Sequence, residues 1–262
     1  MSESISVIVP VYNEPENILN TLERIESHIS LDKEILVIYD NDSDTTLAVL
    51  DKIKDRFGNL KVIKNNIYPG PSGALITGFN EASKTYTLVM MADLCDDLSE
   101  IETVIKKCSN NVEVISFSRF SAGGSAILNK PKAHFNRVFF KHYLKIILPK
   151  LASFFLYSFG GLVINDPTNS YKLYSTKMLK NLDLKSKVSF SVTLEIVMKA
   201  KAMGYRFYEI PTKWTDREFG VTNFPLVKSL IAYLPWFSII LINNRVYSLP
   251  NKFFRRRFLK DD

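Results

Sequence analysis

The sequence predicts an α/β fold with a mostly parallel central sheet and helices on both faces. Short apolar runs typical of buried strands alternate with segments that have the period of amphipathic helices through the first half of the chain. Polar residues follow the ends of three of these runs, and a loop rich in Pro and Gly opens one of the helices. At 262 residues the chain is long enough for one large domain with an appendage, and short for two ordinary domains.

The predicted elements alternate along the chain. Strands are expected over residues 5–9, 34–39, 60–64, 86–91 and 112–117. Helices are expected over about residues 16–28, 44–56, 98–107 and 191–203, with a further helix opened by the turn at 68–74. Such alternation favours parallel pairing, because each helix returns the chain to the start of the next strand.

Acidic residues follow the ends of three predicted strands. Glu14 comes after the first strand, Asp40 after the second, and Asp93 after the strand at 86–91. In open α/β sheets the carboxyl ends of the strands form the edge at which ligands bind. Several carboxylates at one edge favour a cationic ligand, most simply a metal ion that holds a phosphorylated molecule.

Charge and cysteine content narrow the class of partner and the compartment. The chain has 34 Lys and Arg against 27 Asp and Glu, a net charge of +7, and its end is basic. A phosphorylated substrate or an anionic membrane surface fits this charge better than nucleic acid does, because the basic residues are mixed with large apolar runs. Cys95 and Cys108 are too few for a disulfide framework, and the first residues fit a strand better than a secretory signal. We therefore expect a cytoplasmic location.

Two later segments, 135–164 and 224–242, are apolar and aromatic. Their uninterrupted apolar runs, 151–164 and 230–242, are shorter than the ~20 residues that a membrane-spanning helix needs. We predict interfacial helices at the headgroup level, with ordinary core helices as the open alternative. The tail from Lys252 to Lys260 adds a basic, aromatic cluster, in which each cation near an anionic leaflet contributes ~1 kcal/mol.

Six motifs in register resemble those of the family 2 glycosyltransferases. They are Val9–Glu14, Asp40, Gly70–Ala74, Met91–Asp93, Ser118–Phe120 and Asp166–Ser170. Within that family, the pattern over residues 4–224 resembles the dolichol-phosphate (polyprenyl-phosphate) mannosyltransferases. The resemblance implies a GT-A fold, with a catalytic domain over 1–223 and a membrane-associating segment over 224–262. It also implies inverting transfer of a hexose from a nucleotide sugar to a polyprenyl phosphate, by a peripheral protein on the cytoplasmic face of a membrane.

The resemblance also assigns a nucleotide-sugar site. Pro10, Tyr12 and Glu14 would form the shelf for base and ribose, and Asp40 would accept a hydrogen bond from the nucleobase. Asp40 could instead cap the next helix, a role that we expect of Asp44. The remaining residues assigned to this site are Gly70 and Gly73, where backbone can approach a ligand, and Asp93.

A divalent metal ion, Mg²⁺ or Mn²⁺, is the cofactor that the resemblance implies. Asp93 stands where the family has a metal-binding Asp, and Asp96 or Asp97 would complete the shell with the phosphates of the substrate. The family pattern has a second Asp where this chain has Met91. That departure removes one charge and one oxygen donor from the predicted metal site.

Two arginines are the predicted phosphate ligands. Arg119 and Arg217 would bind the diphosphate or an acceptor phosphate, since guanidinium groups pair with phosphate through two parallel hydrogen bonds. Asp166 resembles an acceptor-side motif of the family, and Glu195 lies near the place of a general base in related enzymes. The predicted catalytic residues are therefore Asp93, Arg119, Arg217, Asp166 and Glu195, with Arg137 and Asn223 as possible helpers; His28, His134 and His142 are predicted to be non-catalytic.

Two alternative functions stay open. A glycan or polysaccharide hydroxyl could be the acceptor, and Glu195 or Asp166 would then serve as the base, whereas a lipid phosphate is already largely ionised at pH 7. The loss of the acid at Met91 would also fit a non-catalytic subunit that binds sugar nucleotides. The sequence leaves open whether the donor carries uridine or guanosine.

Overall fold

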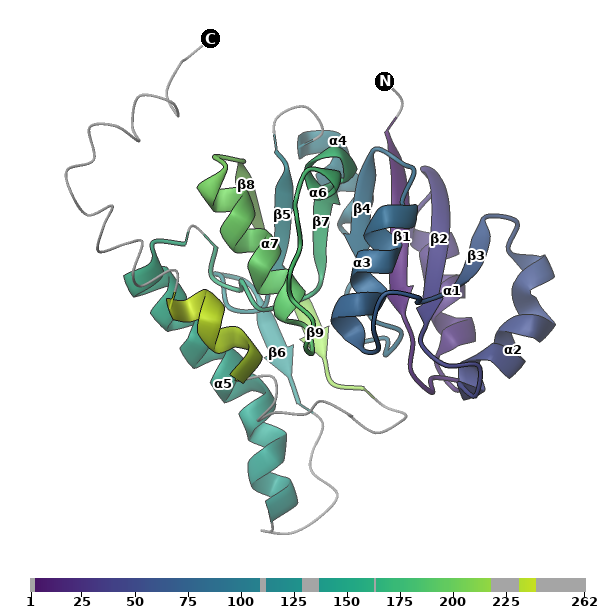
Figure 1. The fold of residues 1–262 in the computed structure, drawn as a ribbon, viewed down its shortest axis with the longest axis horizontal. Helices are drawn as coiled ribbons and strands as arrows, with labels where there is room; N and C mark the ends of the chain where they lie inside the picture. Colours follow the sequence, from purple (N-terminus) through teal and green to yellow (C-terminus); the bar gives the residue numbers. More distant parts are fainter. Residues whose placement is uncertain (1–2, 109–111, 129–136, 163, 218–230, 239–262) are drawn as a thin grey trace.

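The computed structural model describes residues 3–108, 112–128, 137–162, 164–217 and 231–238 of the chain. Its centre is a seven-stranded sheet in the order β3-β2-β1-β4-β7-β5-β8 (Figure 1). The strands pair in parallel, except that β7 is antiparallel to both β4 and β5. The prediction of an α/β fold on a mostly parallel sheet is confirmed.

The strands of the first half begin and end within a few residues of their predicted bounds. The large sheet contains β1 (Ser4–Pro10), β2 (Asp32–Tyr39), β3 (Leu60–Lys64), β4 (Tyr86–Val89), β5 (Val114–Ser118), β7 (Lys172–Ser175) and β8 (Phe207–Pro211). A separate parallel pair is formed by β6 (Ser125–Ile127) and β9 (Lys213–Thr215). In β1, Val7 and Val9 face one core while Ile8 faces the other, which explains why this central strand is apolar at successive positions.

Helices cover both faces of the sheet, as predicted. Their bounds are α1 (Ile18–His28), α2 (Thr45–Ile53), η1 (Lys54–Arg56), α3 (Pro71–Glu81), α4 (Ile101–Cys108), α5 (Arg137–Gly160), α6 (Thr176–Lys180) and α7 (Ser191–Ala202). Buried residues of α1, α2 and α4 pack on one face, and those of α3, α6 and α7 pack on the other. Asp44 caps α2 by accepting a hydrogen bond from the backbone N of Thr46 at 2.8 Å, the role expected of it.

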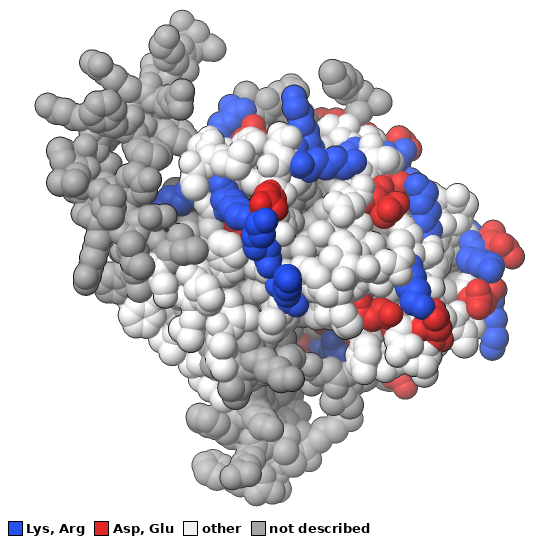
Figure 2. All heavy atoms as spheres, in the orientation of Figure 1, with Lys and Arg blue, Asp and Glu red and all other residues white. Residues whose placement is uncertain are grey.

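The first long apolar segment forms one helix, α5, that continues through Pro149. Its inner side joins α7 and residues 231–238 in a third core cluster that contains Leu156, Leu194 and Tyr233. Its outer side leaves large apolar side chains about half exposed, namely Ile147, Leu151, Phe154, Phe155 and Tyr157. On the face drawn in Figure 2, charged side chains gather over the side of the molecule with α2, whereas the described surface over α5 is mainly uncharged.

One side of α5 therefore packs in a core cluster, as the core-helix alternative predicts, and its other side faces outward; the interfacial role stays a prediction. No helix in the described part of the chain is both long enough and apolar enough to cross a membrane. The predicted domain boundary at residues 223 and 224, and the basic tail at 252–260, lie outside the described residues.

Candidate active site

The predicted site residues gather at the edge formed by the carboxyl ends of the parallel strands. Glu14 follows β1, Asp40 follows β2, Asp93 follows β4, and Arg119 follows β5. Because β7 is antiparallel to its neighbours, the turn before it, which contains Asp166, lies at the same edge. The fold therefore brings together residues that are up to about 150 positions apart in the sequence.

Arg217 joins two of these strand ends. Its Nη1 donates to Oε1 of Glu14 at 3.0 Å, and its Nη2 donates to Oδ2 of Asp93 at 3.0 Å. All three side chains are mostly buried. The two carboxylates hold the pKa of the Arg217 guanidinium above its ordinary value, although burial opposes the charge. Three predicted site residues, from segments that follow β1, β4 and β9, are therefore in direct contact.

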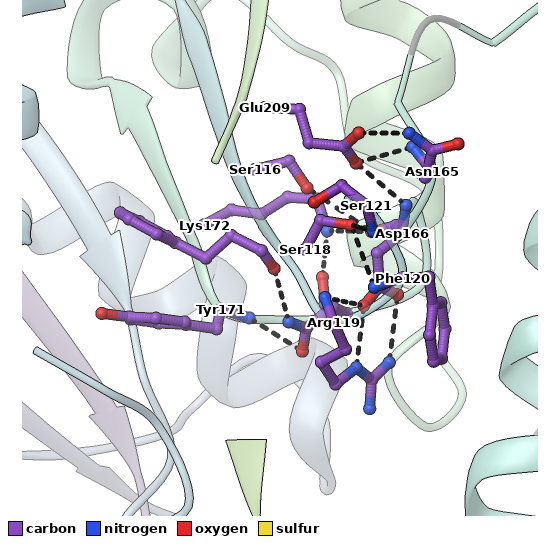
Figure 3. A network of polar contacts seen from close by, with 12 residues as sticks. Ser116, Ser118, Arg119, Phe120, Ser121, Asn165, Asp166, Tyr171, Lys172 and Glu209 are labelled. Carbon is purple, nitrogen blue, oxygen red and sulfur yellow. Dashed lines mark hydrogen bonds and ion pairs between the residues drawn. The ribbon is translucent and has the colours of Figure 1, made fainter. Parts of the chain in front are cut away.

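Arg119 and Asp166 form the second ion pair of the site (Figure 3). Nε of Arg119 donates to Oδ2 of Asp166 at 2.7 Å, Nη2 donates to Oδ1 at 3.0 Å, and the backbone N of Arg119 donates to Oδ2 at 3.2 Å. Asp166 is fully buried, and the guanidinium of Arg119 lies 4.9 Å from the centre of the Phe120 ring. Nη1 of Arg119 has no hydrogen-bond partner among the described residues, so that nitrogen can bind an anion.

Asp96 is a buried carboxyl group that is affected by one residue of each ion pair. Its carboxyl pKa is raised to about 7, mainly by burial and then by the charge of Asp93, while Arg119 and Arg24 act in the opposite direction. The hydrogen bond that it accepts from the backbone N of Met91 is long, at 3.3 Å. The charges of Asp93 and Arg119 both act on the pKa of the Asp96 carboxyl. The two ion pairs therefore share one electrostatic environment.

A divalent metal ion fits this edge as an ion shared with a phosphorylated ligand. No group of three or more His, Cys, Asp or Glu side chains in the described ranges could hold a metal ion. Mg²⁺ is commonly bound through one or two carboxylates together with substrate phosphates, and Asp93 can supply such a carboxylate. Asp96, the predicted second ligand, is buried, and its Oδ2 accepts a hydrogen bond from the backbone N of Met91.

Asp40 belongs to a neighbouring network that shapes the glycine loop. Oδ1 of Asp40 accepts from Nδ2 of Asn65 at 2.7 Å, and Oδ2 accepts from the backbone N of Gly70 at 2.7 Å. Asn65 also binds the backbone O of Tyr68 and the hydroxyl of Thr77. Asp40 does not cap α2, and each of its oxygens keeps acceptor capacity for a further donor.

Two glycines of this loop are required by its geometry. Gly70 has φ +104°, a conformation that strongly favours glycine. A Cβ atom on Gly73 would lie 1.9 Å from the backbone O of Tyr68, so no larger residue fits there without movement. On the neighbouring strand end, Tyr12 is 58% exposed and Pro10 is the last residue of β1.

Glu195 has no hydrogen bond to another predicted site residue among the described contacts. It is fully buried in α7, and its carboxylate accepts hydrogen bonds from the backbone N atoms of Lys185 and Ser186, each at 2.7 Å, and from Nζ of Lys199. Its oxygens are therefore engaged in holding the loop before α7. The described contacts give no support to its predicted role as a base.

The histidines and the suggested helper residues add nothing to the site as described. Nδ1 of His28 lies near the backbone O of Arg24 at the end of α1. The side chains of His142 and Arg137, and all of His134 and Asn223, lie outside the described residues.

Three polar residues of this edge were missed by the sequence analysis. Asn65 holds Asp40, while Lys172 and Glu209 hold the turn that contains Asp166. Asn65 directly follows β3. The argument that polar residues after strand ends lie at the ligand-binding edge, which predicted Asp40, could therefore have predicted Asn65 as well. Lys172 and Glu209 lie within strands, and nothing in their local sequence distinguishes them from ordinary strand residues.

The α/β fold, with its mostly parallel central sheet, matches the GT-A class of fold. Crystal structures of glucosyl-3-phosphoglycerate synthase from Mycobacterium tuberculosis share this fold. The complex with Mn²⁺ and UDP-glucose has a TM-score of 0.63 at 12% identity, over 90% of this chain and 79% of that one. The complex with Mg²⁺ and UDP has a TM-score of 0.58 at 13% identity, over 95% of this chain and 81% of that one.

Sequence comparison identifies the family. The Glycosyl transferase family 2 model matches residues 6–183, and this chain belongs to that family. The dolichol-phosphate mannosyltransferase of Pyrococcus furiosus is 29% identical over 88% of this chain, which spans only 61% of that relative's length. The polyprenol monophosphomannose synthase of Mycolicibacterium smegmatis is 26% identical over 83% of this chain and 79% of its own length.

Proposed function

We propose that this chain is an inverting glycosyltransferase that moves a hexose from a nucleotide sugar to a polyprenyl phosphate at a membrane surface. The observation that carries the proposal is the pair of guanidinium groups, Arg119 and Arg217, held on carboxylates in one electrostatic environment at the ligand-binding edge of the sheet. In a reaction with a phosphate on both substrates, one such cationic group can serve each substrate. The names of the two curated relatives support this class of acceptor.

The donor would bind along the ends of β1, β2 and β4. Asp40 would accept a hydrogen bond from the nucleobase, since uracil and guanine both present an N–H group. Arg217 would contact the diphosphate together with a divalent metal ion on Asp93, and that ion would neutralise negative charge on the departing nucleoside diphosphate. The complexes of structural neighbours with Mn²⁺ and Mg²⁺ support a divalent metal ion as the cofactor.

The acceptor phosphate would bind at Arg119. One of its oxygens attacks the anomeric carbon, the bond from that carbon to the diphosphate oxygen breaks, and the electron pair leaves with the nucleoside diphosphate. The configuration at the anomeric carbon is inverted by this single displacement. A phosphate monoester is largely ionised at pH 7, so no side chain has to remove a proton.

The contacts of the two predicted bases favour this acceptor over a glycan hydroxyl. Both oxygens of Glu195 are held by backbone N–H groups, and both oxygens of Asp166 are held by Arg119. Removing the proton of a hydroxyl acceptor needs a carboxylate that the substrate can reach, and both of these carboxylates are fully buried against donors of the protein itself. An ionised phosphate needs orientation, which Arg119 can supply.

Membrane association is part of the proposal. The outward side of α5 exposes Phe154 at 60% and Leu151 at 50%, and the helix at 231–238 exposes Ile231 at 61%. Large apolar side chains grouped in this way are typical of surfaces that contact membranes or partners. We propose that this surface rests on an anionic leaflet at the cytoplasmic face, where it would meet the lipid acceptor.

A transfer assay tests the proposed function. The purified chain is incubated with Mn²⁺, with GDP- and UDP-hexoses in turn, and with either a polyprenyl phosphate or a panel of oligosaccharides. The proposal predicts transfer to the lipid phosphate and a large loss of transfer in Arg119→Ala. Turnover confined to the oligosaccharides would refute the lipid acceptor, while nucleotide-sugar binding without any transfer would favour a non-catalytic subunit.

A further inference from the structure

Lys172 places an ammonium group in the interior, next to the candidate acceptor site. Its side chain is fully buried, and Nζ donates to the backbone O of Asp166 at 3.1 Å and to the backbone O of Asn169 (Figure 3). Burial lowers the pKa of Lys172 to about 7, and the charge of Asp166 offsets part of that effect. Burying a cation is costly, so these two contacts at opposite ends of one turn need an explanation.

Glu209 holds the same turn from β8, which β5 separates from the strand of Lys172, β7. Its Oε1 accepts from the backbone N of Asn165 at 2.6 Å and from the backbone N of Asp166 at 3.2 Å, and its Oε2 accepts from Nδ2 of Asn165. The far end of the turn is fixed as well, because Nδ2 of Asn169 donates to the backbone O of Phe117 at 2.9 Å. A cation and an anion, both from strands of the central sheet, therefore fix the backbone on either side of Asp166.

The rigid turn determines where Arg119 can lie. The Asp166 carboxylate receives three hydrogen bonds from Arg119, one from the backbone and two from the guanidinium. A guanidinium held by two of its nitrogens in a plane can present only its remaining edge to a ligand. Any shift of the Asp166 backbone would therefore move Nη1 of Arg119 by a similar distance.

We propose that Lys172 and Glu209 are positioning residues that hold the Asp166 turn so that Arg119 is oriented for the acceptor phosphate. This inference rests on the proposed function and adds two residues to it. Neither residue touches a substrate in the proposal; both act through the turn. Their loss is expected to weaken acceptor binding specifically, because the donor residues Asp40 and Asp93 are held by separate contacts.

The substitutions Lys172→Met and Glu209→Gln test the proposal. Methionine keeps an unbranched apolar stem in place of the lysine but removes the donor, and glutamine keeps the shape of Glu209 while one of its two acceptors becomes a donor. Val114→Ala is the control, because it removes buried volume from β5 without touching the turn. Thermal unfolding first establishes that each variant is folded at the assay temperature.

The KM for the acceptor and the KM for the donor are measured separately for each variant, with geranyl phosphate as a short, soluble acceptor. Lys172→Met and Glu209→Gln are each expected to raise the acceptor KM about tenfold or more and to change the donor KM less than about twofold. Val114→Ala is expected to lower the melting temperature and leave both KM values unchanged. If both turn variants fold and keep the acceptor KM of the wild type, the positioning role is wrong.

Calorimetric titration of geranyl phosphate into each protein separates this inference from the proposed function. If the wild type binds no geranyl phosphate, the phosphate acceptor itself is refuted. If the wild type binds it and both folded turn variants bind equally tightly, the acceptor stands and the positioning role is refuted. Weaker binding by both variants, with unchanged binding of nucleotide, supports the inference.

Discussion

Glu34 is a buried carboxylate at the opposite end of the sheet from the site, and it allows a quantitative test of the fold. It accepts hydrogen bonds from the hydroxyl of Ser6 at 2.6 Å, from the backbone N and hydroxyl of Ser83 at 2.7 and 2.8 Å, and from Nζ of Lys61 at 2.8 Å. Burial alone would raise the pKa of Glu34, but these donors lower it from 4.5 to about 2. At about 1.4 kcal/mol for each tenfold change in proton affinity, the charged form stabilises the fold by about 3 kcal/mol.

The sign of the pH dependence follows from the lowered pKa. This stabilisation is fully present above the unfolded-state pKa of 4.5 and is lost as the pH falls toward the folded-state value of about 2. Urea unfolding of the wild type and Glu34→Gln should therefore differ by about 3 kcal/mol at neutral pH, with about 2 kcal/mol of that difference lost by about pH 3. Glu23→Gln, which breaks an exposed ion pair, is the control and should change stability by less than about 1 kcal/mol. A difference between wild type and Glu34→Gln that stays constant with pH would refute the reasoning.

Three further substitutions test the site and the outer surface. Gly73→Ala places a Cβ atom 1.9 Å from a backbone oxygen and should lower both the melting temperature and nucleotide affinity, while Gly58→Ala, with nothing within 4 Å, should lower neither; equal effects would argue against the loop geometry. Asp166→Asn removes the negative charge beside the buried guanidinium of Arg119 and should lower the free energy of unfolding in urea by about 3–5 kcal/mol. A much smaller decrease would show that this ion pair contributes little to stability. Leu151→Glu should leave stability unchanged and reduce co-sedimentation with anionic vesicles; undiminished sedimentation would exclude this part of α5 from the membrane contact.

The sequence predicts the first half of the fold well because its signals are local. The apolar runs at β1 and β2 are buried on both faces, and the acids after them lie at the predicted edge. Asp44 caps α2 as its position before an apolar helix indicates. These features depend on neighbours within a few residues, so no knowledge of the tertiary structure is needed to find them.

The second half depends on pairings that the sequence does not reveal. β7 inserts between β4 and β5 in the antiparallel direction, although more than 50 residues separate it from either strand. The placement of Lys172 follows from this insertion, because an interior strand buries a residue that would be exposed on an edge strand. Alternation of polar and apolar residues alone would assign this lysine to solvent.

The partners of the site residues were also hidden in the sequence. Arg217 was predicted as a phosphate ligand and Glu14 as part of the nucleotide shelf, yet the fold pairs these two side chains with one another. Each has a local signal, in a strand end or a polar loop, but which charges meet depends on the order of strands in the sheet. Glu195 shows the converse, since its place early in α7 resembles that of a base while its carboxylate binds the preceding loop.

Phosphorus NMR of the product tests the central claim most directly, because that claim states which acceptor oxygen forms the new bond. The wild type is incubated with a hexose donor and geranyl phosphate, and the phosphorus signal of the acceptor is followed. The account predicts that the monoester signal is replaced by that of a phosphodiester, and that Arg119→Ala abolishes this change. An unchanged monoester signal while the hexose appears on a hydroxyl group would contradict it.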